Sequence, residues 1–462
     1  RLAGAAKEEQ KGHIFPMVGT VALATCDHET MESLGDPVEQ LGKCHMHALP
    51  AFFLASLTQT ETDQQIRDVM KVHEKWGTQA GFAALRRPLP EIPELREPGP
   101  IRIGLLSSDL RGHSVMKFVS PYLAYHNRKD FQIFVYSTFR GDQDYIEQQL
   151  PERVHQYRRV DALTDREIAE QMRADGIDAL IELNGMTRFG RLPVLSYRAA
   201  PIQIEWLGYP FTTGISNVDF LLADPHLRPT NNDYLMEDAF EMPGAWCSFG
   251  WTTKAPMNED PPCVANGYVT FGTLNNTYKY TPETFRMWAR VLEGVPNSNF
   301  VVVRPEIDSI VLRSNIAKNF SAHGIDPERI LFFNNRVSQI SHDSCYNLFD
   351  ISLDTYPLTG GTTTAESLDM GVPVISRHGP ALHHRISNAI INHVGVTELL
   401  APDADTYVEK AIALAQDIDR LREYRKTLRQ QVRDSVLCDG ERFTTDFEEL
   451  ITKKLKDIGR IV

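Results

Sequence analysis

The pattern of hydrophobic and polar positions divides the chain into a helical beginning and two series of strands. Helix-like apolar spacing runs from His45 to Lys71, and a stretch with five prolines follows from Arg87 to Pro100. From Ile101 onward, short apolar runs alternate with segments of helix length, which is typical of βαβ units and a parallel sheet. We therefore expect a helical N-terminal segment, a proline-rich linker and then an α/β protein.

The predicted strands fall into two groups separated by an irregular connection at about residues 241–266. A helix start at Thr164 with a stop at Gly176, and a helix from Pro282 to about Leu292, mark typical crossovers. The first group of expected strands is Ile101–Leu106, Phe131–Tyr136, Ile177–Leu183, Ile202–Leu207 and Val218–Leu222, and the second is Val269–Leu274, Phe300–Arg304, Ile330–Phe333, Ile351–Asp354 and Val372–Ser376.

Two such series predict two Rossmann-like domains facing a cleft, with ligands at the carboxyl ends of the strands. The expected division is 1–100 for the helical segment and linker, 101–245 for the first domain, 246–266 for the connection, 267–440 for the second domain and 441–462 for a C-terminal helix. The last helices are amphipathic. One of them carries a basic stripe (Arg422, Lys426, Arg429, Arg433), which fits either a partner site or, as we expect, a solvated helix face.

Composition narrows the class of function. With 48 basic and 61 acidic residues among 462, the formal charge is −13, which disfavours binding to DNA or RNA backbones. No apolar run approaches the ~18 residues that span a bilayer. The six cysteines form no C-x-x-C pair, so we expect neither a disulfide framework nor a zinc site, and a reducing, cytoplasmic location.

The strongest chemical signal is LTGGTTTAESLDMGVPVI, from Leu358 to Ile375, directly after a predicted strand. Gly360 and Gly361 let backbone N–H groups approach a ligand, and Thr362 and Thr363 add hydroxyls at a helix start, where phosphate binds readily. Glu366 follows one turn later and is placed to accept hydrogen bonds from a ribose diol. The alternative is a plain tight turn between strand and helix.

A second signal is FGTLNNTYKYTP, where a strand ends in Asn275 and Asn276 and Lys279 precedes a helix. A lysine there can neutralise a diphosphate leaving group as its charge grows in the transition state. The alternative is an exposed loop lysine.

Three further positions carry weaker signals. His113, near a helix start after the first strand, is a candidate proton acceptor or orienting group, although a lone histidine is more often structural. Arg385 follows PALHH and fits either an anion contact or a surface ion pair, and His342 stands at a probable helix start. Walker, H-E-x-x-H, G-x-S-x-G and G-x-G-x-x-G motifs are absent from the sequence.

Taken together, the motifs resemble the catalytic region of the O-GlcNAc transferase and SPINDLY family of protein glycosyltransferases. The ordered set is IRIGLLSSDLRGHSV, IELNGMT, RAAPIQIEWLGYPFTTG, GYVTFGTLNNTYKYTPETFRMWARVLEGVPNS and ISLDTYPLTGGTTTAESLDMGVPVIS, within residues of about 101–455. The resemblance implies a GT-B fold with an acceptor-side first domain and a nucleotide-sugar-binding second domain. It also implies inversion at the anomeric carbon without a metal ion or other cofactor.

The resemblance also implies roles for individual residues. Lys279 matches the lysine at the donor diphosphate, Thr362 and Thr363 the phosphate hydroxyls, and Glu366 the ribose-binding acid. His113 matches an active-site histidine, His342 a histidine near the base, and Arg385 an arginine of the following helix region. We therefore expect His113 and Lys279 as catalytic residues, and Asn275, Asn276, Gln339, His342, Gly360, Gly361, Thr362, Thr363, Glu366 and Arg385 as donor-binding residues.

Two positions depart from the animal O-GlcNAc transferases. Gly361 stands where those have a histidine, and Gln339 where they have a lysine beside the nucleobase. The expected reaction moves N-acetylglucosamine from UDP-GlcNAc onto Ser or Thr of a protein. SPINDLY-like members imply GDP-fucose and O-fucosyl transfer as an alternative, and an inactive nucleotide-sugar-binding scaffold is a third. Since the family usually carries upstream repeats and this chain starts at Arg1, we expect a truncated or short member, cytoplasmic or nucleocytoplasmic, with no nucleic-acid partner and no membrane insertion.

Overall fold

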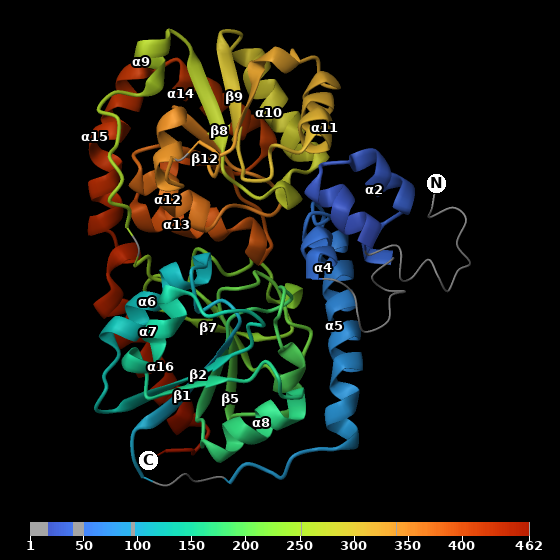
Figure 1. Ribbon diagram of the computed structural model, residues 1–462, viewed down its shortest axis with the longest axis vertical. Helices are drawn as coiled ribbons and strands as arrows, with labels where there is room; N and C mark the ends of the chain where they lie inside the picture. Colours follow the sequence, from blue (N-terminus) through green and yellow to red (C-terminus); the bar gives the residue numbers. More distant parts are fainter. Residues whose placement is uncertain (1–16, 40–49, 94–97, 251, 339, 462) are drawn as a thin grey trace. The chain divides into compact units, whose positions relative to one another are not determined.

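The computed structural model describes residues 17–39, 50–93, 98–250, 252–338 and 340–461 (Figure 1). The chain forms two compact units. One unit joins Arg1–Thr62 to Thr252–Ser435, and the other joins Asp63–Trp251 to Val436–Val462. The units therefore group segments that are distant in sequence, whereas the division expected from the sequence pattern runs consecutively along the chain.

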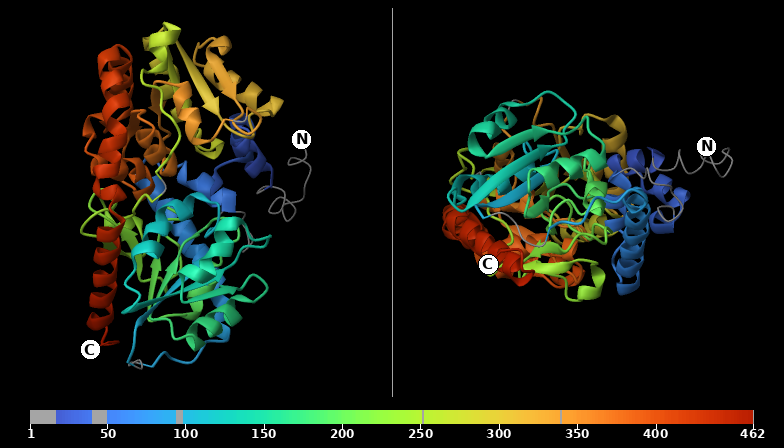
Figure 2. Two further views of the ribbon diagram at one scale, coloured as in Figure 1. Left: turned by 60° about the vertical axis from the view of Figure 1, so that its left-hand side comes forward. Right: turned by 90° about the horizontal axis from the view of Figure 1, so that it is seen from below.

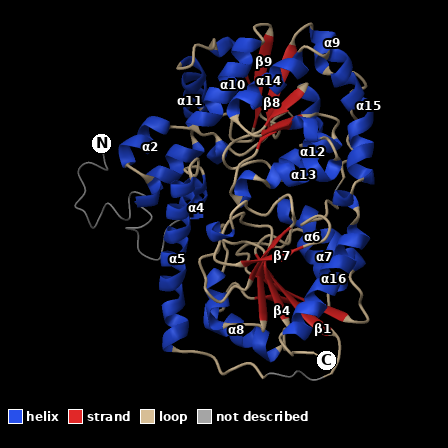
Figure 3. Cartoon of the chain, turned by 180° about the vertical axis from the view of Figure 1, so that it is seen from behind, coloured by secondary structure: helices blue, strands red, loops and turns tan. Residues whose placement is uncertain are grey.

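The unit that contains Asp63–Trp251 is built on a seven-stranded parallel sheet in the order β3-β2-β1-β4-β5-β6-β7. All four residues of β4 and of β5 are buried, as expected of central strands that are covered on both faces. The strands, red in Figure 3, are β1 Ile101–Ser107, β2 Phe131–Ser137, β3 Gln156–Arg159, β4 Ala179–Glu182, β5 Ile202–Glu205, β6 Phe220–Ala223 and β7 Asp238–Glu241. The helices are α5 Asp63–Arg86, α6 Ser114–Tyr125, α7 Tyr145–Arg153, α8 Asp165–Ala174 and α16 Gly440–Asp457.

Sequence patterns explain these helices. Thr164 and Glu167 form a capping box at the start of α8, as the sequence predicts. The apolar stripe of α16 is buried, and Phe447 meets Tyr122 of α6 edge to face with ring centroids 5.2 Å apart. The final helix of the chain therefore completes the core of this unit (Figure 2).

The unit that contains Thr252–Ser435 has a six-stranded parallel sheet in the order β10-β9-β8-β11-β12-β13. Its core is rich in aromatic rings. The ring centroids of Trp288 in α10 and Phe300 in β9, for example, lie 4.7 Å apart. The strands are β8 Val269–Thr273, β9 Ser298–Val303, β10 Ile330–Phe333, β11 Ile351–Leu353, β12 Val374–Arg377 and β13 Leu400–Ala401. The helices are α2 His28–Leu34, α4 Pro50–Leu57, α9 Pro262–Asn266, α10 Pro282–Gly294, α11 Ile310–Ser321, α12 Thr362–Asp369, α13 Ile386–Val394, α14 Ala404–Ala415 and α15 Ile418–Asp434.

Helix α15 uses arginines to hold the end of α12. Arg429 Nε donates to the Asp369 carbonyl at 2.7 Å, and Arg433 Nε lies 3.1 Å from Asp369 Oδ1. Arg425 is 2% exposed and donates to the carbonyl of Phe349 at 2.7 Å. The solvated-face interpretation of the basic stripe is therefore wrong for Arg429, which is partly buried against carbonyl oxygens, whereas Arg433 is exposed and reaches Asp369 from the surface.

The sheet order fixes where each unit presents its loops. In the first sheet described above, strand order reverses between β1 and β4, and in the second between β8 and β11. At such a switch point the connecting loops leave in opposite directions and open a crevice at the carboxyl ends of the strands. The loops after β1, β4, β8 and β11 are therefore the places to look for a site.

Three strands were not predicted, and the reason is compositional. β3 (QYRR) and β7 (DAFE) are polar edge strands, and β13 has only two residues. Several expected bounds are also off by one or two residues. For example, β5 stops at Glu205, since Leu207 has a left-handed φ of 81°, and β6 begins at Phe220. The proline-rich stretch is neither helix nor strand over its described residues, as expected.

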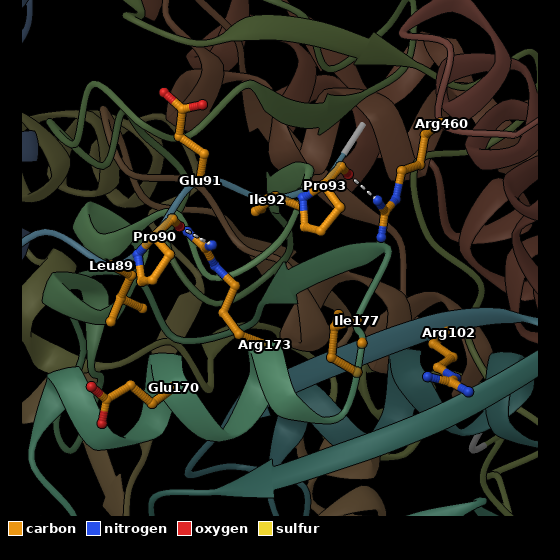
Figure 4. Close-up of a pocket in the computed structure, with 11 residues that line it drawn as sticks. Leu89, Pro90, Glu91, Ile92, Pro93, Arg102, Glu170, Arg173, Ile177 and Arg460 are labelled. Atoms are coloured by element: carbon orange, nitrogen blue, oxygen red, sulfur yellow. Dashed lines mark hydrogen bonds between the residues drawn. The ribbon is translucent and has the colours of Figure 1, made fainter. Parts of the chain in front are cut away.

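The proline-rich stretch lies against the amino ends of the strands, over a cavity of about 570 Å³ (Figure 4). Arg173 Nη1 donates to the carbonyl of Pro90 at 2.6 Å, and Arg460 donates to that of Pro93. Because Arg102 near the start of β1 and Ile177 just before β4 line this cavity, it lies at the end of the sheet opposite to the loops of the switch point.

Five of the six cysteines lie in the described residues. Of these, Cys26, Cys247, Cys263 and Cys345 are buried free thiols. None of the described helices is long and apolar enough to span a bilayer.

Candidate functional site

Asp354, the residue that follows β11, organises the loops at the switch point between β8 and β11. Its side chain is 1% exposed. Oδ1 accepts the Gly360 N–H at 2.8 Å and the Asn275 amide at 3.1 Å, and Oδ2 accepts the Ser376 and Ser387 hydroxyls at 2.6 Å each. One buried carboxylate thereby ties the end of β8, the glycine–threonine turn and the start of α13 together.

Lys279 reaches into this arrangement from the loop after β8. Its Nζ donates to the Thr359 carbonyl at 2.7 Å, one residue before Gly360. Removal from water lowers the pKa of Lys279 to about 8, while the nearby Asp354 carboxylate acts in the opposite direction. The ammonium is thus a half-buried cation beside a turn of free backbone donors.

The glycine–threonine turn begins α12 directly. Gly361 is the N-cap residue and Thr362 the first helical residue, so the unpaired N–H groups of the first turn lie at this point. A Cβ at Gly360 would lie 2.4 Å from Thr364 Oγ1, so this position requires glycine, whereas at Gly361 the nearest atom would be Ile386 Cγ2 at 3.4 Å. Thr363 Oγ1 donates to Asn275 Oδ1 at 2.9 Å, which joins the two predicted motifs.

A second set of polar groups lies one turn into α12. Glu366 is 4% exposed, and its Oε2 lies 3.1 Å from His342 Nε2 and accepts the Tyr346 hydroxyl at 3.1 Å. The His342 side chain is 47% exposed. An acid fixed from two sides, with an accessible imidazole beside it, can accept hydrogen bonds from a diol and present a ring edge to a base.

The other predicted donor-binding residues are placed as follows. Asn276 is exposed and caps the short turn at Thr277–Lys279 by accepting the Tyr278 N–H at 3.2 Å. Arg385 precedes α13 and donates to the Gly379 carbonyl at 3.3 Å. Gln339 lies outside the described residues.

His113 belongs to the other unit, at its own switch point after β1. It is the N-cap residue of α6, where Nδ1 lies 3.4 Å from the Val115 N–H and 3.7 Å from Asp109 Oδ2. Burial lowers the pKa of His113, and the Asp109 carboxylate opposes that shift. A neutral imidazole at neutral pH is the form that can accept a proton.

Asp109 is itself held by the loop after β4. Asn184 Nδ2 donates to Asp109 Oδ2 at 2.8 Å, and Asn184 Oδ1 accepts the Ser108 N–H at 2.8 Å. Asn184 thereby joins the loop after β4 to the loop after β1, and His113 gains a carboxylate neighbour that is held in place.

Sequence reasoning missed Asp354, Tyr346, Asp109 and Asn184. Asp354 was detectable as the polar residue that closes the apolar run ISLD, and Asp109 as the acid four residues before His113. Tyr346 and Asn184 carry no local signal, because only the fold brings them to Glu366 and Asp109.

No group of three or more His, Cys, Asp or Glu side chains in the described ranges has the geometry to hold a metal ion. Lys279 and the start of α12 place positive charge at the glycine–threonine turn.

Comparison with known proteins decides the family. The model of glycosyl transferase family 41 matches residues 90–243 and 263–447, which is most of the chain. The chain belongs to glycosyl transferase family 41. The family match covers every loop described above, including those after β1, β4, β8 and β11.

Several curated relatives are plant proteins. The chain is 32% identical over 355 residues to the probable UDP-N-acetylglucosamine–peptide N-acetylglucosaminyltransferase SPINDLY of Solanum lycopersicum, which covers 76% of this chain and 38% of the relative. It is 26% identical to the corresponding protein SEC of Arabidopsis thaliana, over 82% of this chain and 40% of the relative. The chain thus spans less than half the length of the curated relatives it matches.

A solved structure supports the fold. A lysine-to-methionine variant of the O-GlcNAc transferase of Thermobaculum terrenum superposes with a TM-score of 0.76 at 24% identity, over 97% of this chain and 90% of that one. The α/β fold with two parallel sheets is therefore of the GT-B type, as the sequence predicts.

Proposed function

We propose that this chain is a protein O-glycosyltransferase that moves N-acetylglucosamine from UDP-GlcNAc onto Ser or Thr hydroxyls, with inversion and without a metal ion. The observation that carries the proposal is the pairing of Lys279 with the glycine–threonine turn at the β8–β11 switch point. A half-buried cation opposite a helix start is a site for a diphosphate. The names of the SPINDLY and SEC relatives agree with this donor.

Each part of the donor has a counterpart in this unit. The diphosphate would lie between Lys279 and the N–H groups at Gly361 to Thr363. The ribose diol would bind Glu366, and the base would lie near His342. Asn275 and Gly360 act indirectly, because Asp354 holds both in place.

In the transfer, the acceptor oxygen attacks the anomeric carbon from the face opposite the diphosphate. The new carbon–oxygen bond forms as the bond to the diphosphate oxygen breaks, and the electron pair leaves with the nucleoside diphosphate. Lys279 stabilises that growing negative charge, an interaction that is stronger in the transition state than with the bound donor. His113, oriented by Asp109, is the candidate to accept the proton of the acceptor hydroxyl.

The decisive experiment compares Lys279→Met with the wild type. Purified protein is incubated with UDP-GlcNAc and an acceptor protein mixture, and added hexosamine is measured by mass spectrometry. We expect transfer to fall by a factor of about 100 or more, as for loss of one transition-state charge contact. Lys254→Met, at an exposed lysine of the same unit, is the control and should transfer normally. Normal transfer by the Lys279→Met variant would contradict the mechanism.

O-fucosyl transfer from GDP-fucose is the second candidate. The observation in its favour is that identity is higher to SPINDLY proteins, for example 34% to that of Hordeum vulgare, than to SEC at 26%. Gly361, where animal O-GlcNAc transferases have a histidine, points the same way. A thermal-shift comparison of UDP with GDP separates the candidates, because the ligand with the higher affinity gives the larger stabilisation at equal concentration.

A further inference from the structure

A short N-terminal segment, Ala24–His28, packs against the turn that presents Lys279. The segment joins a helical stretch at residues 17–24 to α2, and α2 lies beside α11 in the same unit (Figure 1). About 250 residues separate it from the turn at residues 277–280, named here the Lys279 turn. The contact is therefore a product of the tertiary fold.

The segment contacts the backbone on both sides of Lys279. Thr277 Oγ1 donates to the Ala24 carbonyl at 3.0 Å, and Cys26 Sγ lies 3.9 Å from the Thr277 carbonyl oxygen. On the other side, His28 Nε2 donates to the Tyr280 carbonyl at 2.8 Å. The residues before and after Lys279 are thus tied to one five-residue segment.

His28 is itself held in one orientation. Its Nδ1 lies 3.0 Å from Asn319 Oδ1. The amide nitrogen of Asn319 donates to the carbonyls of Cys26 and Asn315, at 3.1 and 2.8 Å, so its oxygen faces Nδ1. Both ring nitrogens of His28 therefore face acceptor oxygens, and the ring donates to both of them only as the imidazolium. The ring also packs edge-on against Phe285 with centroids 5.7 Å apart. A side chain fixed by α10 and α11 therefore sets the position of the Tyr280 carbonyl.

We propose that His28 is a positioning residue for the transfer reaction, and that it acts by holding the Lys279 turn so that the Lys279 ammonium faces the glycine–threonine turn. The inference rests on the proposed function. The ammonium has little freedom to compensate for a displaced backbone, because Nζ is already bound to the Thr359 carbonyl at 2.7 Å. A displacement on the order of 1 Å at a reacting group can cost a factor of about 100 in rate.

The test uses two substitutions that differ in one hydrogen bond. His28→Gln places an amide nitrogen near the position of Nε2 and keeps donation to the Tyr280 carbonyl, whereas His28→Asn is too short to reach it. His323→Asn, at an exposed histidine after α11, is the matched control. We expect His28→Asn to lower kcat by a factor of about 10 or more with KM for the donor changed less than threefold, and His28→Gln to restore kcat to within about threefold. Equal loss in both variants, or unchanged kcat in His28→Asn, would overturn the proposal.

A double-mutant cycle shows whether His28 acts through Lys279. The cycle measures nucleotide binding, so its result does not depend on sugar transfer. Binding of UDP and GDP is measured by calorimetry for the wild type, His28→Asn, Lys279→Met and the double variant. We expect His28→Asn to weaken binding of the preferred nucleotide about fivefold in the wild type and to have no further effect beside Lys279→Met. The same loss in both backgrounds would overturn the positioning role. Absence of sugar transfer by the wild-type protein, with the cycle intact, would contradict the proposed function alone.

Discussion

At the scale of single residues, two properties matter at the candidate site: the pKa of a buried lysine and the room for a Cβ at two glycines. Lys279 is a cation kept beside Asp354, which was not predicted as a site residue yet accepts hydrogen bonds from both loops of the switch point. Gly360 and Gly361 are adjacent and look equivalent in sequence. Gly360 has no room for a Cβ, whereas Gly361 has room for one.

The lowered pKa of Lys279 predicts how nucleotide binding depends on pH. The side chain loses its proton as pH rises through about 8, so the positive charge at the proposed diphosphate site is present below that pH and lost above it. Affinity for the preferred nucleoside diphosphate should therefore fall between pH 8 and 9.5, as calorimetry would measure. In Lys279→Met the affinity should be lower and nearly constant over this range. An equally steep fall in that variant would contradict the assignment.

The two glycines predict opposite outcomes on substitution. Gly360→Ala forces a Cβ to within 2.4 Å of Thr364 Oγ1 and 3.0 Å of Asp354 Oδ1, and should lower the free energy of unfolding by about 1–3 kcal/mol. Gly361→Ala meets only Ile386 Cγ2 at 3.4 Å and should cost less than about 1 kcal/mol. Urea unfolding measures both, and equal destabilisation would show that the turn is not packed as described.

At the scale of elements, α12 is fixed at both ends by different parts of its unit. Its start is tied through Thr364 Oγ1, 2.8 Å from Ser387 Oγ of α13, and its end is tied to arginines of α15. The helix that carries Thr362, Thr363 and Glu366 is thereby held rigidly against the sheet. Rigid support of this kind is what a phosphate-binding turn needs to be preorganised.

Arg425 tests that support. Replacement by Met removes the donor to the Phe349 carbonyl at 2.7 Å and the Met370 carbonyl at 3.2 Å, and leaves both oxygens unpaired in the interior. We expect Arg425→Met to lower the free energy of unfolding by about 2–4 kcal/mol. Arg422→Met on the same helix, which breaks two exposed pairs, with Asp260 at 3.0 Å and with Asp419 at 3.3 Å, should cost less than about 1 kcal/mol. A similar effect of both substitutions in thermal or urea unfolding would refute the supporting role.

At the scale of the whole molecule, each unit combines one terminal segment of the chain with an internal segment that is distant in sequence. The unit with the first sheet takes α16 from the C-terminal end, and the unit with the second sheet takes α2 and α4 from the N-terminal region. The unit with the first sheet also buries carboxyl groups at the carboxyl ends of its central strands. Burial raises the pKa of Glu182 to about 7, and raises that of Glu205 well above its usual value.

These carboxyls predict a pH dependence of stability. Glu182 is protonated in the folded unit up to about pH 7 but ionises near 4.5 when unfolded, so its contribution is complete below pH 4.5 and is lost as pH rises to 7. Glu182→Gln, which stays neutral, should flatten the fall in urea-unfolding free energy over this range by up to about 3 kcal/mol. Glu152→Gln, at an exposed glutamate of the same unit, should leave the slope unchanged. An unchanged slope in Glu182→Gln would contradict the assignment.

The sequence by itself determined the two βαβ series, the glycine–threonine turn at a helix start and the loop lysine. These are local properties, set by periodicity, by backbone freedom at glycine and by the order of strands and helices. They suffice for the fold and the family, while the donor-binding roles of Lys279 and Glu366 stay predictions.

Only the tertiary structure decided which distant residues meet. It joined Asn275 to Thr363, gave Asp109 a partner in Asn184, placed Tyr346 on Glu366 and packed Ala24–His28 on the Lys279 turn. It also determined that Arg429 and Arg433 both bind the buried Asp369. Such contacts have no local signature, because burial and pairing depend on which surfaces the folded chain brings together.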